Sequence, residues 1–172
     1  ELLRELSRCD CGLPEIVLGA EVYYFRGMSE SDQLERLTIG GKKCILIEMP
    51  LGPWTSEMYR ELEDISLRRG LTPIVAHIDR YIRPFHTHGI PQTLRTLPVL
   101  VQANASFFTD RSTQGMALRL LKSDQIHLLG SDCHNLTTRK PDLGHALRLI
   151  EQKLGMGALQ RINEYERELL DT

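Results

Sequence analysis

Residues 43–77 read KCILIEMPLGPWTSEMYRELEDISLRRGLTPIVAH, and this stretch decides the fold class. Residues 43–49 and 71–77 are short apolar runs, which are typical of strands that are covered on both faces. Between them, apolar residues recur at helical spacing over residues 56–69, and Gly70 is placed to cap this helix. A strand, a helix and a second strand in this order predict a parallel β-α-β unit.

The same alternation continues on both sides of this unit. It has no internal repeat and no linker long enough to divide two domains, so we expect a single α/β domain over residues 1–172. Further strands are predicted at residues 15–24, 98–103 and 125–131, and further helices at residues 29–37, 91–97, 112–122, 143–154 and 156–170, with residues 1–8 as the end of an earlier helix.

The composition excludes several classes of function. The net charge of −2 gives no electrostatic basis for binding nucleic acid. No apolar run approaches the roughly 20 residues that a membrane-spanning helix needs, so no membrane insertion is expected. The four cysteines are too sparse for a secreted disulfide framework, and Cys9 and Cys11 lack the second pair that a zinc site needs. We therefore expect a cytoplasmic protein.

Acidic and histidine side chains stand at or near the ends of four predicted strands. Carboxylates in apolar runs are costly unless they are paired, protonated or coordinated to a metal. The carboxyl ends of parallel strands meet at one edge of a sheet, where active sites lie. Mixed imidazole and carboxylate ligands suit Mn, Fe or Zn. The sequence therefore predicts a divalent-metal site formed by Glu21, Glu48, His77, Asp132 and His134.

Two arginines follow these groups. Arg80 comes three residues after His77, and Arg139 comes five residues after His134. A guanidinium offers paired donors to phosphate oxygens and stabilises charge on a phosphoryl group in transfer. Beside a metal site, both arginines are therefore expected to hold a substrate phosphate.

The remaining candidate ligands are interpreted as structural. If Asp132 and His134 lie on one face of an extended segment, Cys133 points the other way and is expected to be a small core residue. His86 and His88 form a His-x-His sequence in a loop flanked by Pro and Gly, which we expect to be solvated. His127 and His145 are expected to be a strand and a helix histidine without a role in the site.

Several segments together resemble a known family, the bacterial protein-tyrosine phosphatases of the PHP (polymerase and histidinol phosphatase) superfamily. These manganese-dependent enzymes belong to capsule and exopolysaccharide operons. The resemblance covers essentially the whole chain in the family's order. It is carried by Gly19-Ala-Glu-Val-Tyr-Tyr24, Ile45-Leu-Ile-Glu48, Thr72-Pro-Ile-Val-Ala-His-Ile-Asp-Arg-Tyr81, Gly130-Ser-Asp-Cys-His-Asn135 and Arg139-x-Pro141.

The resemblance implies a distorted (β/α)7 TIM-like barrel with a cluster of up to three metals. Mn²⁺ is the expected metal, with Fe, Zn and Mg as alternatives. The implied reaction is attack on phosphorus by a metal-bound hydroxide, and the implied substrate is phosphotyrosine on a partner tyrosine autokinase. The family also suggests a homo-oligomer. Carried over by position, the metal ligands are Glu21, Glu48, His77, Asp132 and His134, and the phosphate-binding residues are Arg80 and Arg139.

The sequence departs from the family at its start. The family begins with a His-x-His motif on its first strand, an acidic residue shortly after it and a further His on its second strand, and none of these precedes Glu21. We therefore expect the first one or two β/α units of the barrel to be missing from this sequence. Alternative readings keep the scaffold but change its role, to a histidinol-phosphate or nucleic-acid phosphoesterase, or to a non-catalytic assembly module.

Overall fold

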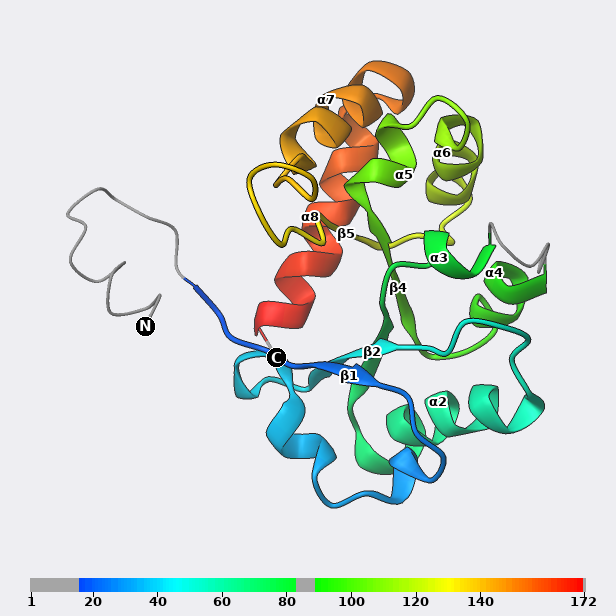
Figure 1. Ribbon diagram of the computed structural model, residues 1–172. Coiled ribbons are helices and arrows are strands. Elements are labelled where there is room, and N and C mark those ends of the chain that lie inside the picture. The colour runs from blue at the N-terminus through cyan, green and yellow to red at the C-terminus, as the bar shows by residue number, and fades with distance from the viewer. Residues whose placement is uncertain (1–15, 83–88, 172) are drawn as a thin grey trace.

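A five-stranded parallel sheet forms the centre of the protein (Figure 1). The computed structural model describes residues 16–82 and 89–171. Every pair of neighbouring strands is parallel, and the strands follow one another in chain order. This confirms the predicted parallel α/β architecture. The strands are β1 (Glu21–Tyr23), β2 (Cys44–Glu48), β3 (Thr72–Val75), β4 (Leu100–Asn104) and β5 (Leu128–Gly130).

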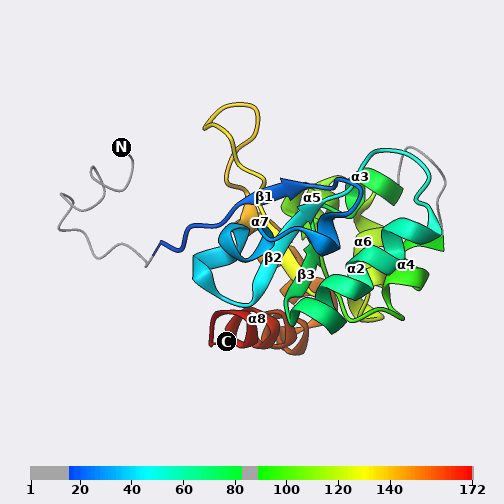
Figure 2. The same ribbon diagram turned by 90° about the horizontal axis from the view of Figure 1, so that it is seen from below.

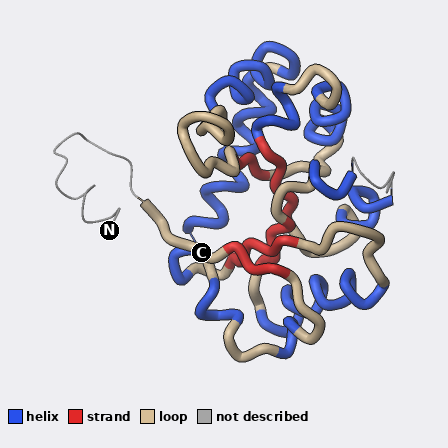
Figure 3. The backbone as a smooth tube through the Cα atoms, in the orientation of Figure 1, coloured by secondary structure: helices blue, strands red, loops and turns tan. Residues whose placement is uncertain are grey.

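Helices surround the sheet (Figure 3). The helix between β2 and β3 has the predicted limits because its sequence contains both end signals. The Thr55 hydroxyl accepts the N–H of Met58 at its start, and Gly70 takes the left-handed conformation at its end. The helices are α2 (Ser56–Arg69), α3 (Asp79–Ile82), α4 (Gly89–Leu94), α5 (Ala105–Thr109), α6 (Gln114–Lys122), α7 (Leu143–Leu154) and α8 (Met156–Asp171).

The two faces of the sheet have different surroundings. The main hydrophobic core lies on one face, where Ile47 and Val75 pack with residues of helices α2 to α7. On the other face a smaller cluster packs against the C-terminal half of α8, which lies across the sheet from α2 (Figure 2). This second face carries Glu21 and Leu46, which are partners in the β1–β2 register. It is the face that presents the candidate site.

The first strand is much shorter than the predicted residues 15–24. In the β1–β2 register Glu21 lies opposite Leu46, which places residue 19 opposite Cys44, where β2 begins. Residues 16–18 therefore extend past the start of the partner strand and are exposed. Glu21 is the first residue of β1, whereas the sequence placed it at a strand end.

The predicted helix over residues 29–37 is also wrong. Two short 3₁₀ helices, η1 (Met28–Glu30) and η2 (Leu34–Leu37), occupy this region, and a third, η3 (Ile39–Gly41), follows them. Met28 and Leu34 are both fully buried, but six residues do not bring two side chains to one face of an α-helix. Each turn is therefore anchored separately.

One helix was not predicted, and several predictions fall outside the residues that the structure describes. Helix α5 was not predicted, although Phe107 and Phe108 of this helix are buried. The proposed early helix at residues 1–8, Cys9 and Cys11, and the His86-Thr-His88 sequence lie outside the described residues. Among the residues that the structure describes, no helix is long and apolar enough to cross a membrane.

Candidate metal and phosphate site

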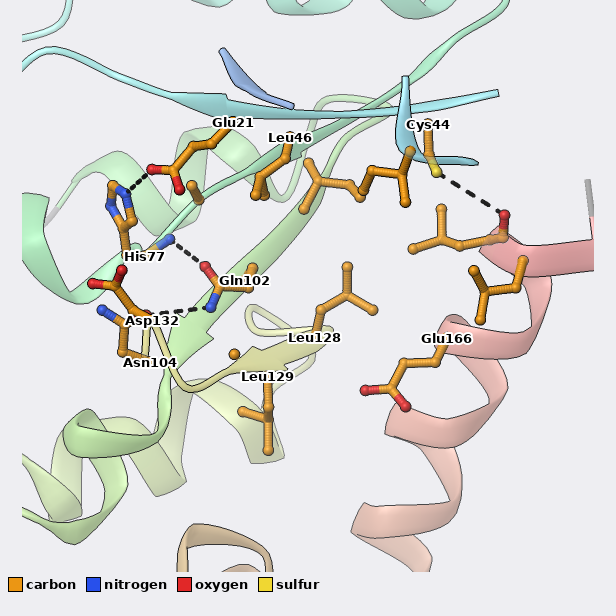
Figure 4. Close-up of a pocket in the computed structure, with 16 residues that line it drawn as sticks. Glu21, Cys44, Leu46, His77, Gln102, Asn104, Leu128, Leu129, Asp132 and Glu166 are labelled. Atoms are coloured by element: carbon orange, nitrogen blue, oxygen red, sulfur yellow. Dashed lines mark hydrogen bonds and ion pairs between the residues drawn. The ribbon is translucent and has the colours of Figure 1, made fainter. Parts of the chain in front are cut away.

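Three of the predicted ligands meet at one point of the sheet. His77 Nε2 lies 2.9 Å from Glu21 Oε1 and 3.6 Å from Glu48 Oε1. One ligand atom from each of these residues lies within 4.8 Å of the other two. Figure 4 shows Glu21 of β1 and His77, which follows β3, pointing toward each other. One imidazole nitrogen and two carboxylates form a donor set that fits a divalent metal such as Mn, Fe or Zn.

His77 occupies an unusual backbone position. It follows the end of β3 at Val75 and has a φ of 32°, in the left-handed region that non-glycine residues rarely adopt. The residue is only 2% exposed. This conformation ends the strand and starts the turn into α3, so that the imidazole and the following Arg80 belong to one tight structural unit.

The imidazole is held from behind by Tyr81. The Tyr81 hydroxyl lies 3.3 Å from His77 Nδ1 and accepts the backbone N–H of Met49 at 2.9 Å. Burial is the main cause that raises the pKa of Tyr81, so its hydroxyl keeps its proton at neutral pH. The ring packs edge-on against Trp54 with centroids 5.1 Å apart. Tyr81 therefore contacts Nδ1, the ring nitrogen that points away from the candidate metal, and so helps to direct Nε2 toward Glu21 and Glu48.

Both predicted phosphate-binding arginines reach the site. Arg80 Nη1 lies 3.0 Å from Glu48 Oε1, and Arg80 Nη2 lies 2.5 Å from Asp132 Oδ2. Arg139 Nη2 forms an ion pair with the same Asp132 oxygen, and its Nη1 lies 3.1 Å from His134 Nε2. Asp132 thus joins the two guanidinium groups at the edge of the three-residue ligand group.

The predicted arrangement of residues 132–134 needs correction. Asp132 has a φ of 49°, so the segment is a loop and the alternation of an extended strand does not apply. Cys133 is exposed, and the prediction that it is a core residue is wrong. His134 has a side chain that is 57% exposed and lies outside the group formed by Glu21, Glu48 and His77. Asp132 also lies outside that group, although it lines the same pocket as Glu21 and His77.

A polar loop carries Arg139 to the site. The Asn135 side-chain oxygen accepts the backbone N–H groups of Thr137, Thr138 and Arg139 at 2.7–3.0 Å. The backbone N–H of His134 donates to the carbonyl of Arg139 at 3.1 Å. Sequence reasoning did not assign a role to Asn135, although side chains of this type commonly organise turns by bonding to the following backbone.

Two members of the ligand group, Glu21 and His77, line a pocket of about 340 Å³. Glu21, His77 and Asp132 line one end, and apolar side chains such as Leu46 and Leu128 line the middle (Figure 4). Glu166 of α8 lies farther along the wall, and burial raises the pKa of its carboxyl. The pocket therefore combines a charged end with an apolar wall.

His145 lies in a helix, as predicted, whereas His127 lies just before the strand that was predicted to contain it. His127 immediately precedes β5 and is buried, and its Nδ1 accepts the backbone N–H of Val101 at 3.0 Å. Burial lowers its pKa, with a smaller opposing effect from Asp124. His145 lies in α7, 3.8 Å from Asp142. Neither histidine is a member of the ligand group.

Comparisons with known proteins agree with the predicted family. Residues 3–169 match the family described as capsular polysaccharide synthesis, CpsB/CapC. The tyrosine-protein phosphatase CpsB of Streptococcus agalactiae serotype V is 29% identical over 150 residues, which cover 82% of this chain and 61% of that protein. The tyrosine-protein phosphatase YwqE of Bacillus subtilis is 29% identical over 154 residues, covering 83% of this chain and 58% of that protein. The chain thus spans about three fifths of the length of these relatives.

A solved structure shares the fold. It is described as one of the crystal structures of YwqE from Bacillus subtilis and CpsB from Streptococcus pneumoniae, unique metal-dependent tyrosine phosphatases. The match has a TM-score of 0.85 and covers 99% of this chain and 70% of the solved chain at 24% sequence identity.

Proposed function

The chain belongs to the CpsB/CapC family of capsular polysaccharide synthesis, and from this membership we propose that it carries the core of a metal-dependent protein-tyrosine phosphatase. The observation that carries the proposal is the contact between Arg80 and the ligand group, to which Arg139 is joined through their shared partner Asp132. Arg80 Nη1 lies 3.0 Å from Glu48 Oε1 and 3.4 Å from His77 Nε2. A phosphate held by this guanidinium would lie directly beside the ligand atoms.

Each group has a distinct part in this proposal. Glu21, Glu48 and His77 would hold a metal, and Asp132 and His134 would add further ligands. Bound there, a divalent metal supplies positive charge toward phosphate oxygens and lowers the pKa of a coordinated water. Arg80 and Arg139 would exchange their present carboxylate partner, Asp132, for a phosphate, because both are oxyanions that accept paired N–H donors. They would stabilise the charge that develops on the phosphoryl group.

The finer features of the enzyme are proposals as well. Mn²⁺ is the metal we propose, with Fe, Zn and Mg as alternatives that the same donor set accepts. We also propose that residues 1–172 belong to one domain, a PHP-type (β/α)7 barrel. Its support is the strand order, since all five described strands are parallel and neighbours in the sheet are neighbours in the chain.

The proposed substrate is phosphotyrosine in a protein, and the proposed partner is a tyrosine autokinase of capsular or exopolysaccharide synthesis. The names of the relatives support a phosphotyrosine substrate, the family description supports the setting in capsule synthesis, and the autokinase is what the resemblance to the phosphatase family implies. We place the activity in the cytoplasm, where free thiols such as those of Cys44 and Cys133 persist. We further propose a homo-oligomer, which light scattering on the purified protein tests.

The test is a phosphatase assay with a Mn²⁺ supplement. The 172-residue chain and the full-length product of its gene are assayed on p-nitrophenyl phosphate, a phosphotyrosine peptide and histidinol phosphate. We expect Mn²⁺-dependent release of phosphate from the phosphotyrosine peptide, and its loss in His77→Ala. His145→Ala is the matched control, because it removes an exposed imidazole outside the ligand group.

Two outcomes contradict the proposal. A preference for histidinol phosphate by the Mn²⁺-loaded full-length protein indicates a small-molecule phosphoesterase on the same scaffold. An absence of hydrolysis of all three substrates by that protein indicates a non-catalytic module.

A further inference from the structure

The side-chain amide of Gln102 lies directly against the backbone of His77 (Figure 4). Gln102 Oε1 accepts the backbone N–H of His77 at 2.5 Å. The backbone carbonyl of Gln102 accepts the next N–H, that of Ile78, at 2.9 Å. One residue of β4 therefore binds two consecutive N–H groups of the turn that follows β3.

This turn needs support because its first residue is strained. His77 has a φ of 32°, and a non-glycine residue keeps this left-handed conformation only where its surroundings hold it there. The regular β3–β4 pairing ends with Val75 opposite Val101. Past this point the Gln102 amide oxygen is the acceptor for the His77 N–H. The Gln102 amide thus continues the backbone hydrogen bonding at His77, the candidate metal ligand that follows the end of β3.

Gln102 is itself held in place. Its Nε2 donates to the Ala103 carbonyl at 3.0 Å and to Asn104 Oδ1 at 3.3 Å. Asn104 in turn donates its backbone N–H to Asp79 Oδ1 at 3.0 Å and its Nδ2 to Asp79 Oδ2 at 3.4 Å. Asp79 lies between His77 and Arg80 in the chain. The network therefore starts and ends in the segment that carries a candidate metal ligand and a candidate phosphate ligand.

Gly130 provides the room for this amide. It lies opposite Asn104 in the β4–β5 register, and a Cβ built at Gly130 would overlap Gln102 Nε2. The backbone of Gly130 is not in the left-handed region, so conformational freedom is not what this position requires. The position requires a residue without a side chain, because the Gln102 amide fills the space that a side chain would take.

We infer that Gln102 is a positioning residue for the metal ligand His77, and that Gly130 is needed because it leaves space for the Gln102 amide. The inference rests on the proposed function in that His77 binds a metal. Gln102 acts on the metal through His77, by holding the peptide whose conformation aims the imidazole at Glu21 and Glu48.

The test compares the 172-residue chain with its Gln102→Met variant, which keeps the length of the side chain and removes the amide. Binding of Mn²⁺ is measured by the electron paramagnetic resonance signal of the free ion. We expect Gln102→Met to weaken Mn²⁺ binding by about 10- to 100-fold, as is typical when a residue that orients a metal ligand is lost. Gln125→Met is the matched control, because Gln125 donates to Ser123 and makes no contact with His77. A Mn²⁺ affinity of Gln102→Met within about threefold of that of the parent chain overturns the inference.

Amide hydrogen exchange gives a second measurement that does not depend on metal. We expect the His77 N–H to be protected in the parent chain and in Gln125→Met, and to lose its protection in Gln102→Met. If the parent chain binds no Mn²⁺, the proposal that Glu21, Glu48 and His77 hold a metal in this chain fails, and exchange at His77 still decides whether Gln102 holds this peptide. Equal protection in the parent chain and in Gln102→Met overturns the inference even if Mn²⁺ binds.

The role of Gly130 is tested by making the Gly130→Ala substitution in two proteins, the parent chain and the Gln102→Ala variant. Gly130→Ala should weaken Mn²⁺ binding in the parent chain by about tenfold, because its methyl group displaces the amide from His77. In a Gln102→Ala background the same change should add less than about twofold, since the side chain it would displace is gone. Equal effects in the two backgrounds overturn the assignment of Gly130.

Discussion

Arg80 Nη2 lies 2.5 Å from Asp132 Oδ2, so a guanidinium of α3 contacts the loop after β5. The other terminal nitrogen of Arg80 lies 3.0 Å from Glu48 Oε1 at the end of β2. The planar guanidinium of Arg80, which follows β3 in the chain, thereby links the end of β2 to the loop after β5. This geometry depends on two donors that point in fixed directions, which an arginine has and a lysine lacks.

Replacing Arg80 by Lys tests this bridging. The ammonium keeps the charge but cannot contact Glu48 and Asp132 with a fixed pair of donors, and it offers a phosphate one point of contact. For Arg80→Lys we expect kcat/KM on a phosphotyrosine peptide to fall by about 100-fold, while Mn²⁺ affinity changes by less than about threefold. Steady-state kinetics of the Mn²⁺-loaded full-length protein provides the measurement.

The control for this substitution is Arg26→Lys. Arg26 forms an exposed ion pair with Glu57, away from the ligand group, so its replacement should leave kcat/KM unchanged. Arg80→Lys with the kcat/KM of the parent protein would contradict a role of Arg80 in holding the phosphate.

Tyr81→Phe removes a single hydroxyl from the core behind His77. The Met49 N–H then loses its acceptor and His77 Nδ1 loses its partner, while the ring contact with Trp54 is retained. We expect the free energy of unfolding to fall by about 1–3 kcal/mol because a buried donor is left unsatisfied. We also expect Mn²⁺ affinity to fall by about tenfold, because the imidazole is oriented less well.

Urea unfolding and Mn²⁺ titration measure these two effects of Tyr81→Phe. Tyr59→Phe is the matched control, since Tyr59 also packs on Trp54 but only partly buries its ring. A Tyr81→Phe variant with unchanged Mn²⁺ affinity would show that the hydroxyl serves stability alone.

Glu61 is expected to matter for stability and not for the site. It is 7% exposed, and its two carboxylate oxygens accept the backbone N–H groups of Gly27 and Met28 at 2.8 and 3.1 Å. Glu61→Ala leaves two backbone donors of the segment after β1 without their acceptor, so we expect a loss of about 2–4 kcal/mol in the free energy of unfolding.

Chemical denaturation of the Glu61→Ala variant checks this value. Glu63→Ala makes the same change two residues along α2 at a less buried position, and we expect it to change stability by no more than about 0.5 kcal/mol. Similar losses in the two variants would contradict the role of the Glu61 carboxylate contacts, and helix propensity would not explain them, since Ala is the better helix former.

His127 makes stability depend on pH. Burial lowers its pKa below the ordinary value of 6.5, so on acidification the unfolded chain takes up a proton before the native protein does. The free energy of unfolding therefore falls as pH decreases from about 6.5 toward the native pKa of His127. In His127→Gln this contribution is absent, and the loss of stability between about pH 7.5 and pH 5.5 should be smaller.

Urea unfolding at the two pH values measures this difference. The comparison uses the change with pH within each protein, so any constant effect of His127→Gln on stability cancels. His145→Gln is the control, because the His145 side chain is 54% exposed. Equal pH dependence in His127→Gln and the parent chain would contradict the contribution of His127.

The sequence was most informative where the structural signals are local. The limits of α2 agree with the prediction because Thr55 and Gly70 cap this helix from positions next to it in the chain. The length of β1 could not be predicted, because it depends on pairing with β2, which is distant in the chain. Cys133 was misplaced for a related reason, since the alternation of a strand does not hold in a loop that contains a left-handed residue.

The candidate site shows the same division. The sequence by itself determined that carboxylates, histidines and arginines stand near successive strand ends, because apolar runs and the polar residues after them are adjacent in the chain. Only the tertiary structure decided which of these groups meet. It brought Glu21 and Glu48 to His77, left His134 outside that group, placed the Gln102 amide against the backbone of His77, and placed Gly130 against that amide. These contacts join residues 25 or more apart in the sequence, and they depend on strand register and on the course of loops, which no local pattern encodes.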